Sequence, residues 1–191
     1  MDHPTTAELE AALDDIRRAP VGIGRVDLIV RRPGEGTREV LDEGELDTSL
    51  GLVGDNWVLR GSKETEDGSP HPLRQLNVMS ARAAAAIAGP IEHWPLAGDQ
   101  LFVDLHLGAE ELPTGTRLHI GDAVIEVTSP PHLGCAKFIA RFGKEAMRFV
   151  NSPVGRSLNL RGICARVVVG GTVRTGDSIT AVTAADVVTT S

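Results

Sequence analysis

The sequence is poor in aromatic residues: among 191 residues there is no tyrosine, and only four phenylalanines and two tryptophans occur. So few rings make a stacking surface for nucleic-acid bases hard to build. The formal net charge is −7, with 26 acidic against 19 basic side chains, whereas binding to a phosphate backbone needs a surplus of lysine and arginine. We therefore expect no nucleic-acid partner.

Cysteines and long apolar runs are also scarce. The two cysteines, Cys135 and Cys164, are too few for a disulfide-stabilised scaffold. No stretch approaches the roughly 20 apolar residues of a membrane-spanning helix, and the first ten residues lack the apolar segment of a secretion signal. Hydrophobic residues make up 41% of the chain, which is enough for a buried core. These features predict a cytoplasmic protein with no membrane partner.

Residues 1–20 are predicted to form an N-terminal helical arm. Within it, residues 5–18 have the features of a helix: a threonine can cap the start, and acidic side chains precede the basic ones along the segment. Leu9 and Ile16 belong to an apolar stripe at helical spacing, and Pro20 follows the end. We expect this amphipathic arm to lie on the rest of the domain.

Residues 21–185 are predicted to form one mainly β domain of the α+β class, with residues 186–191 as a tail. Short β-type runs alternate here with glycine-containing turns, a pattern typical of a closed or nearly closed barrel rather than of a parallel sheet. The predicted strands are residues 22–30, 37–41, 57–60, 73–79, 100–107, 116–120, 123–128, 163–169 and 178–182.

Two helices are predicted between the strands. The first covers residues 81–88, with Ser80 as its cap and Gly89 at its end. The second covers residues 136–150, where three of the four phenylalanines fall on one face. The polar segment 61–72 is predicted to be a mobile loop.

Cys135 is the first candidate functional residue, because it directly precedes the phenylalanine-rich helix. A helix N-terminus favours a thiolate, and Lys137 and Arg141 add positive charge nearby. A thiolate can ligate a soft metal, carry a persulfide sulfur or attack an electrophile. The alternative is that Cys135 is a small buried residue, as many free cysteines are. Cys164 lies within a β-type run, for which we favour that buried, structural interpretation.

His132 stands three residues before Cys135, but no second Cys/His pair completes a structural zinc site. We therefore expect His132 to orient the thiol or a ligand. Arg156 and Arg161 flank hydroxyl and amide side chains, an arrangement that can clamp a phosphate; a solvated loop is the alternative. The sequence contains none of the glycine-rich signatures of nucleotide-binding folds.

Several segments, taken in order, resemble the MOSC domain, named after the C-terminal part of molybdenum cofactor sulfurase. The resemblance covers nearly the whole chain, from Val21 to Val182. The matching segments are Gly51-Leu52-Val53-Gly54-Asp55, Arg74-Gln75-Leu76-Asn77-Val78, Gly98-Asp99-Gln100-Leu101, 112–122, Pro130-Pro131-His132-Leu133-Gly134-Cys135 and 161–177.

The resemblance implies a MOSC-like β-barrel of mixed strands with an N-terminal helix and two or three peripheral helices. It also implies that Cys135 ligates molybdenum in a pterin cofactor, and that the protein is an oxidoreductase that reduces N-hydroxylated small molecules with electrons from a separate redox partner. No pyridoxal phosphate is expected in this chain. The residues expected to bind or surround the cofactor are Arg161, Arg156, His132, Lys137, Asp55, Gln75, Asp99 and Gln100.

Two other functions stay open. As a sulfur carrier, Cys135 would accept a persulfide from a cysteine desulfurase and pass it to an acceptor in metal–sulfur cluster or cofactor assembly. As a non-catalytic binding module, the protein would keep the fold with an altered ligand site. Gly98-Asp99-Gln100-Leu101 stands where the family commonly has Arg-Glu-Asn-Leu, and this difference leaves the last alternative open.

Overall fold

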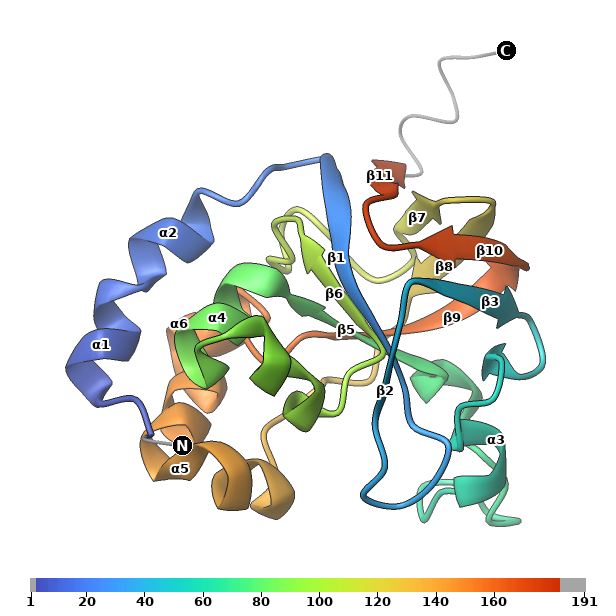
Figure 1. The fold of residues 1–191 in the computed structure, drawn as a ribbon, viewed down its shortest axis with the longest axis horizontal. Coiled ribbons are helices and arrows are strands. Elements are labelled where there is room, and N and C mark those ends of the chain that lie inside the picture. Colours follow the sequence, from blue (N-terminus) through green and yellow to red (C-terminus); the bar gives the residue numbers. More distant parts are fainter. Residues whose placement is uncertain (1–2, 183–191) are drawn as a thin grey trace.

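A closed β-barrel of seven strands forms the centre of the protein in the computed structural model, which describes residues 3–182 (Figure 1). Around the barrel the order is β1-β11-β7-β8-β9-β5-β6, and β6 pairs with β1 again. Only β5 and β6 are parallel among these neighbours, so the barrel is mixed. Its strands are β1 (Ile23–Arg31), β5 (Leu76–Ser80), β6 (Leu101–Asp104), β7 (Arg117–Ile120), β8 (Ala123–Val127), β9 (Ile163–Val169) and β11 (Ser178–Val182).

Strand β1 closes the barrel because it is long enough to pair with three other strands. Its first residues pair with β11, its centre with β6 and its last residues with β2 (Glu39–Leu41). The register with β6 shifts between Val26 and Leu28, and such a bulge bends a strand and increases its twist. The loop that joins β1 to β2 extends away from the barrel (Figure 1).

Alternating side chains on the barrel strands serve two apolar cores. Val78 and Leu101 belong to the core inside the barrel, whereas Met79 and Phe102 belong to a second core between the barrel and the helices. Because side chains of a strand point alternately to its two faces, β1, β5 and β6 contribute to both cores, whereas the buried apolar residues of the other barrel strands belong to the inner one. Their burial supplies the main driving force for this arrangement.

Helices cover one side of the barrel (Figure 1). The arm packs there through Leu9 and Ile16, and Thr5 caps it in a reciprocal pair of bonds with Glu8. The long helix α5 is kinked at Gly143, where φ is 84°. The helices on this side are α1 (Thr6–Ala11), α2 (Leu13–Arg17), α4 (Ala81–Ala88), α5 (Ala136–Asn151) and α6 (Pro153–Ser157), together with the 3-10 helix η2 (Ile91–Ala97).

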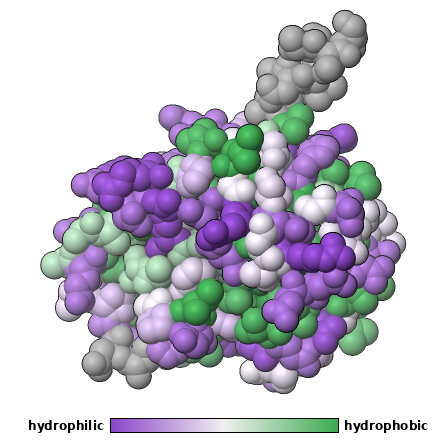
Figure 2. Space-filling view, turned by 45° about the horizontal axis from the view of Figure 1, so that its top comes forward, coloured by the Kyte–Doolittle hydropathy of each residue, from purple (hydrophilic) through white to green (hydrophobic). Residues whose placement is uncertain are grey.

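A small three-stranded sheet and a short helix lie on the other side of the barrel. The sheet consists of β3 (Glu43–Asp47), β4 (Gly51–Leu52) and β10 (Gly171–Arg174), and the helix is α3 (Trp57–Arg60). On the face drawn in Figure 2, hydrophilic and hydrophobic residues are interspersed, as on most exposed protein surfaces. Within residues 3–182, no helix is both long and apolar enough to cross a bilayer.

The predicted barrel and its peripheral helices are confirmed, with corrections in detail. Residues 57–60 were predicted as a strand but form α3: the Asp55 carboxylate accepts the Trp57 N–H at 3.0 Å, and the Arg60 N–H returns to the Asn56 carbonyl. The predicted strand 73–79 begins with the 3-10 turn η1 (Pro72–Arg74). Strands β3, β4 and β10 were not predicted. The predicted tail, residues 186–191, lies outside the described residues.

Candidate functional site

A cavity of about 770 Å³ lies between the β1–β2 loop, α3 and the first half of α5. Cys135 lines it, and the thiol-bearing residue is exposed. Among the described residues, Glu35 is the one acidic side chain in the wall. The basic side chains in the wall are Arg32, Arg38, Arg60, Lys137, Arg141 and Arg161. The cavity is therefore strongly cationic in a protein that is acidic as a whole.

Cys135 is held at the cavity by the packing of the residue before it. Gly134 donates its N–H to Asn151 Oδ1 at 3.1 Å, and a Cβ at this position would lie 2.5 Å from Met147 Sδ. A larger residue here would require Met147 and Val150 of α5 to shift. Cys135 then occupies the N-cap position of α5 with extended backbone. Its exposure contradicts the alternative that it is a small buried residue.

Four arginines from different parts of the chain bind four successive carbonyl oxygens at the end of η2. We call these four residues the arginine array. The bonds are Arg38 Nε to Pro95 O (3.1 Å), Arg141 Nη1 to Leu96 O (2.6 Å), Arg161 Nη2 to Ala97 O (2.9 Å) and Arg32 Nη1 to Gly98 O (2.7 Å). Helix C-termini carry unpaired carbonyls and partial negative charge, so η2 gathers these cations at one place.

Two members of the array are neutralised by buried carboxylates. Arg32 donates to both oxygens of Asp55, each at 2.8 Å, and Arg161 donates to Asp99 Oδ2 at 2.6 Å. Both carboxylates are completely buried. Arg161 also lies over the Phe138 ring, 5.0 Å from its centroid. These contacts fix Arg32 and Arg161 in single positions.

The other cavity arginines have no carboxylate partner within residues 3–182: Arg38, Arg60 and Arg141 form no ion pair there. Burial lowers the pKa of Arg38, and the charges of Arg141 and Arg32 lower it further. The pKa of Arg60 is likewise lowered, first by burial and then by Arg32. Cations that repel one another in a partly desolvated cavity form a site for an anion.

Four buried side-chain atoms in the described part of the chain have no hydrogen-bond partner: Asn56 Oδ1, Asp99 Oδ1, His132 Nδ1 and Arg161 Nε. Three of these residues line the cavity, and Asp99 contacts two of them from behind. Unpaired buried polar atoms are rare and often mark the place of a ligand or water. The clustering of these unpaired atoms around one cavity supports, independently of the arginines, that a molecule binds there.

His132 and Asp99 have opposite shifts in pKa. Burial and the charges of Arg161, Arg74 and Arg32 hold the pKa of His132 well below its usual range, so the imidazole is neutral. Burial raises the pKa of Asp99, although Arg161 opposes this. His132 Nδ1 lies 3.4 Å from Asp99 Oδ1, but the two atoms are not aligned for a hydrogen bond.

Four of the predicted site residues line the cavity: Cys135, His132, Lys137 and Arg161. Lys137 pairs with Glu35 at 3.1 Å across the mouth. Arg156 does not line it; this exposed residue, on α6, donates to Asn151 O at 3.1 Å. The prediction that Arg156 and Arg161 converge on one phosphate therefore does not fit the structure.

The four remaining predicted residues lie behind the cavity wall rather than in it. Asp55 and Asp99 hold the arginines described above. Gln75 accepts the Val167 N–H at 2.7 Å, and Gln100 accepts the Asn77 N–H at 2.9 Å. Their side chains satisfy backbone groups of barrel strands, so they support the wall and do not contact a ligand.

Sequence reasoning missed Arg32, Arg38, Arg60 and Asn56 as cavity residues. The available signal was the excess of arginine, because the chain has only three lysines among 19 basic residues. Arginine is the side chain that binds carbonyls and phosphates with a fixed, planar set of donors. Which arginines meet depends on η2, which was not predicted.

Cys164 is buried in β9, as expected. Burial raises the pKa of its thiol to about 11. It lines a second, smaller cavity of about 330 Å³, and His132 lines both cavities. Nowhere in residues 3–182 do three histidine, cysteine, aspartate or glutamate side chains converge as a metal site.

The fold and site define a mixed β-barrel protein with an exposed cysteine at a cationic cavity. The family model of the MOSC domain matches residues 67–180, and the chain belongs to this family. YuaD from Bacillus subtilis has a similar structure: TM-score 0.62 at 16% identity, over 83% of this chain and 95% of that one. YiiM from Escherichia coli gives 0.54 at 21% identity, over 83% and 70% of the two chains. A comparison with curated proteins found no match.

Proposed function

We propose that the cavity binds a molybdenum–pterin cofactor, with Cys135 as the protein ligand of the metal, and that the protein reduces N-hydroxylated compounds. The observation that carries this proposal is the meeting of three features in one cavity: the exposed Cys135, the arginine array and the unpaired buried atoms. The MOSC family is associated with this cofactor, and the barrel is of the MOSC type.

The residues present fit such a group. A pterin cofactor carries an acidic phosphate and hydrogen-bonding ring atoms, and the cavity offers guanidinium donors without carboxylate partners. The unpaired Arg161 Nε supplies a further buried donor. The volume of about 770 Å³ lies within the range of roughly 300–1,000 Å³ typical of cofactor and small-ligand sites.

Each residue then has a defined task. Cys135 ligates the metal from the N-terminus of α5, and Arg38 and Arg141 hold the phosphate, because their charges are not neutralised by a carboxylate. Asp55 and Asp99 keep Arg32 and Arg161 in place. When bound, the cofactor would supply two-electron redox chemistry for breaking the substrate N–O bond, in which the oxygen leaves as water with two protons from solvent and a separate redox partner supplies the two electrons.

His132 is suited to form a hydrogen bond with the cofactor or the substrate while it stays neutral. Its imidazole is neutral, so one ring nitrogen carries a proton and the other can accept one. The ring lies in the cavity wall with Nδ1 facing Asp99. Protonation at Nδ1 would be stabilised by the Asp99 carboxylate and opposed by the nearby arginines.

Elemental analysis tests the proposal. The protein is produced in cells that make the cofactor, and molybdenum is measured per chain. We expect about one molybdenum atom in the unsubstituted protein, loss of most of it in Cys135→Ser, and retention in Cys164→Ala as the matched control. Absence of molybdenum from the unsubstituted protein would contradict the proposal.

A second function is supported by the exposure of Cys135 alone. As a sulfur carrier, its thiolate would attack the terminal sulfur of a desulfurase persulfide, forming the Cys135 persulfide and releasing the desulfurase thiolate. Mass spectrometry after incubation with a cysteine desulfurase and cysteine tests this. One added sulfur on Cys135 supports it, and an unchanged mass eliminates it.

A further inference from the structure

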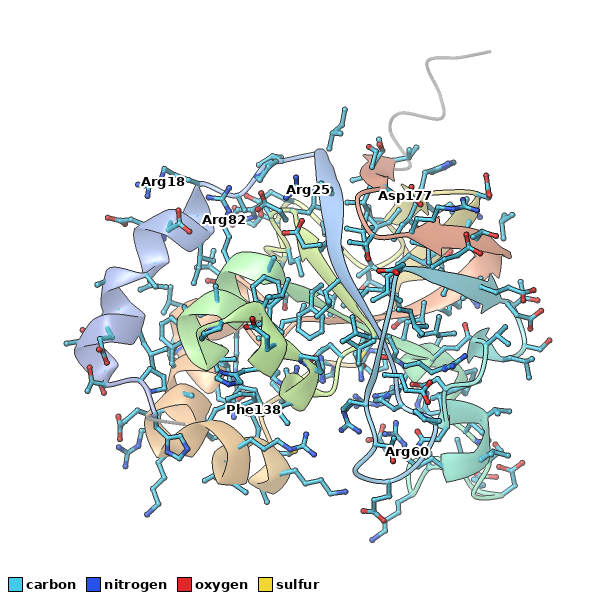
Figure 3. The ribbon with its side chains drawn as sticks, viewed as in Figure 1. Arg18, Arg25, Arg60, Arg82, Phe138 and Asp177 are labelled. Atoms are coloured by element: carbon cyan, nitrogen blue, oxygen red, sulfur yellow. The ribbon has the colours of Figure 1, made fainter. Side chains whose placement is uncertain are left out.

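The cavity has a further cation, Arg60, which lies near enough to Arg32 and Arg38 of the arginine array to repel them but does not bind the η2 carbonyls. Arg60 ends α3 and lines the cavity, yet its guanidinium has no hydrogen bond or ion pair with any other described residue. Each arginine of the array, by contrast, holds one carbonyl of η2. In Figure 3, Arg60 comes from α3 on the right, and Phe138 from α5 on the left. Arg60 and Cys135 thus stand on different walls.

Arg60 is in an environment that favours an anion. The residue is exposed as a whole, but its position in the cavity partly removes water from the guanidinium, and Arg32 repels it; both effects lower its pKa. A cation that is partly desolvated and faces another cation is stabilised by a bound negative group. The Asp55 charge partly offsets these effects, but no carboxylate within residues 3–182 forms an ion pair with Arg60.

Asn56 supplies a second unsatisfied group beside Arg60. The two residues are four positions apart, so they share one face of the α3 turn. Asn56 Oδ1 is buried and accepts no hydrogen bond, and Asn56 also lines the cavity. Arg60 thus presents a free cation to the cavity, and Asn56 adds a buried, unsatisfied amide oxygen to the same wall. This pair is complementary to a molecule with an acid group and an N–H or O–H donor.

We propose that Asn56 and Arg60 form the substrate subsite, and that the substrate is an N-hydroxylated compound with a phosphate or carboxylate group. This inference rests on the proposed function, because it assigns the array to the cofactor phosphate and the metal to Cys135. The array guanidiniums are positioned in advance by carbonyl bonds, as a permanent cofactor site requires. Arg60 lies at the end of α3 and has no such bond. It is therefore available to bind the substrate, which associates and dissociates in each turnover.

Isothermal titration calorimetry on the cofactor-loaded protein tests the subsite with three probes: phenyl phosphate, benzoate and benzamide. We expect phenyl phosphate or benzoate to bind at least about tenfold more tightly than neutral benzamide, equivalent to about 1.4 kcal/mol. The tighter of the two identifies the acid group. Arg60→Gln is expected to abolish the preference, and Arg117→Gln, which replaces an exposed arginine on β7, is expected to retain it.

Kinetics provide a second readout. With benzamidoxime and 4-carboxybenzamidoxime as substrates, Arg60→Gln should raise the KM for the carboxylated compound about tenfold relative to the KM for benzamidoxime, with little change in the ratio of the two kcat values. This split is expected of a group that binds substrate away from the reacting atoms. Equal binding of benzoate, phenyl phosphate and benzamide, or a preference that survives Arg60→Gln, would overturn the subsite.

Molybdenum content separates this inference from the proposed function. Arg60→Gln is expected to retain its molybdenum; loss of the metal would show that Arg60 holds the cofactor instead, and would overturn the subsite. If the unsubstituted protein takes up no molybdenum, the proposed function fails. The same titration on the metal-free protein then still tests whether Asn56 and Arg60 bind an acidic ligand. In the metal-free protein, a preference for the acidic probes that is lost in Arg38→Gln but kept in Arg60→Gln would contradict the inference.

Discussion

Arg38 and Arg141 converge on Gly98. A Cβ at that glycine would lie 3.7 Å from Nη2 of Arg38 and 3.7 Å from Nη1 of Arg141. The two guanidiniums are held there by the neighbouring carbonyls of Pro95 and Leu96, and the charge of Arg141 contributes to the lowered pKa of Arg38. Like charges are thus kept together in the absence of ligand, which lowers stability and favours anion binding.

Arg141→Gln should therefore weaken anion binding with little cost in stability. The lost hydrogen bond to Leu96 O, worth about 1 kcal/mol, is offset by relief of the repulsion from Arg38. Added phosphate should raise the melting temperature of the unsubstituted protein more than that of the variant, because a ligand stabilises the folded state by mass action. Arg148→Gln, an exposed position on α5, is the control. An equal phosphate effect in all three proteins would contradict this account of the pair.

Asp99→Asn should be strongly destabilising. Asp99 is completely buried and is the carboxylate partner of Arg161 at 2.6 Å, so its neutralisation leaves a buried cation without compensation. Removal of one partner of a buried ion pair typically costs about 3–5 kcal/mol. Urea denaturation measures the change. Asp14→Asn, with a side chain that is 81% exposed, should change stability by less than about 0.5 kcal/mol. A loss below about 1 kcal/mol for Asp99→Asn would show that the pair is not structural.

His132 should make the protein less stable in mild acid. Because the pKa of this buried imidazole is well below its usual 6.5, the unfolded chain takes up the proton at a higher pH than the folded protein does. The contribution of His132 to the free energy of unfolding is therefore fully present above about pH 6.5. It decreases as the pH falls, by up to about 1.4 kcal/mol per pH unit. The raised pKa of Asp99 acts in the opposite direction, at pH values above its ordinary 3.8.

Urea unfolding of the unsubstituted protein and of His132→Gln between pH 7.5 and 5.0 isolates this effect, because Asp99 is present in both. The variant should show the shallower loss of stability with decreasing pH. Identical slopes would mean that the pKa of His132 is the same in the folded and unfolded protein, which contradicts this account.

The barrel was predictable because its strands are short, alternate in polarity and end at glycine-containing turns. The predicted ranges for β9 and β11 agree with the structure, and the hairpin turn at Gly121-Asp122 joins β7 to β8. Residues 57–60 were misassigned because four residues cannot define a period, and a long-range feature decided between helix and strand: Asp55 is fixed by Arg32 and so caps the turn.

The site was only partly predictable. Cys135, His132 and Lys137 are close in sequence, so local reasoning found them. What brings the cavity arginines together is the end of η2, where Arg32, Arg38 and Arg141 each bind a backbone carbonyl. No local sequence pattern reveals these long-range contacts. The acids and amides of the family segments, such as Asp99 and Gln100, were assigned to the cavity although they support it from behind; sequence resemblance identifies such residues but does not distinguish these two roles.

Leu9→Ala tests whether the N-terminal arm is part of the domain's core. Leu9 is 1% exposed and packs in the helical core, so its truncation should cost about 2–5 kcal/mol. Val21→Ala, at a position that is 65% exposed, should cost less than about 0.5 kcal/mol. Cooperative unfolding by urea, followed by circular dichroism, gives both values. Equal, small losses would mean that the arm detaches before the barrel unfolds.

Anomalous X-ray diffraction at the molybdenum absorption edge is the most direct test of the central proposal. In crystals of the protein purified from cells that make the cofactor, we predict one molybdenum peak next to Cys135 Sγ, in the cavity between α3 and α5. The same peak should be absent from Cys135→Ser crystals. A molybdenum peak away from Cys135, or an unchanged peak in the serine variant, would contradict the assignment of this cysteine as the metal ligand.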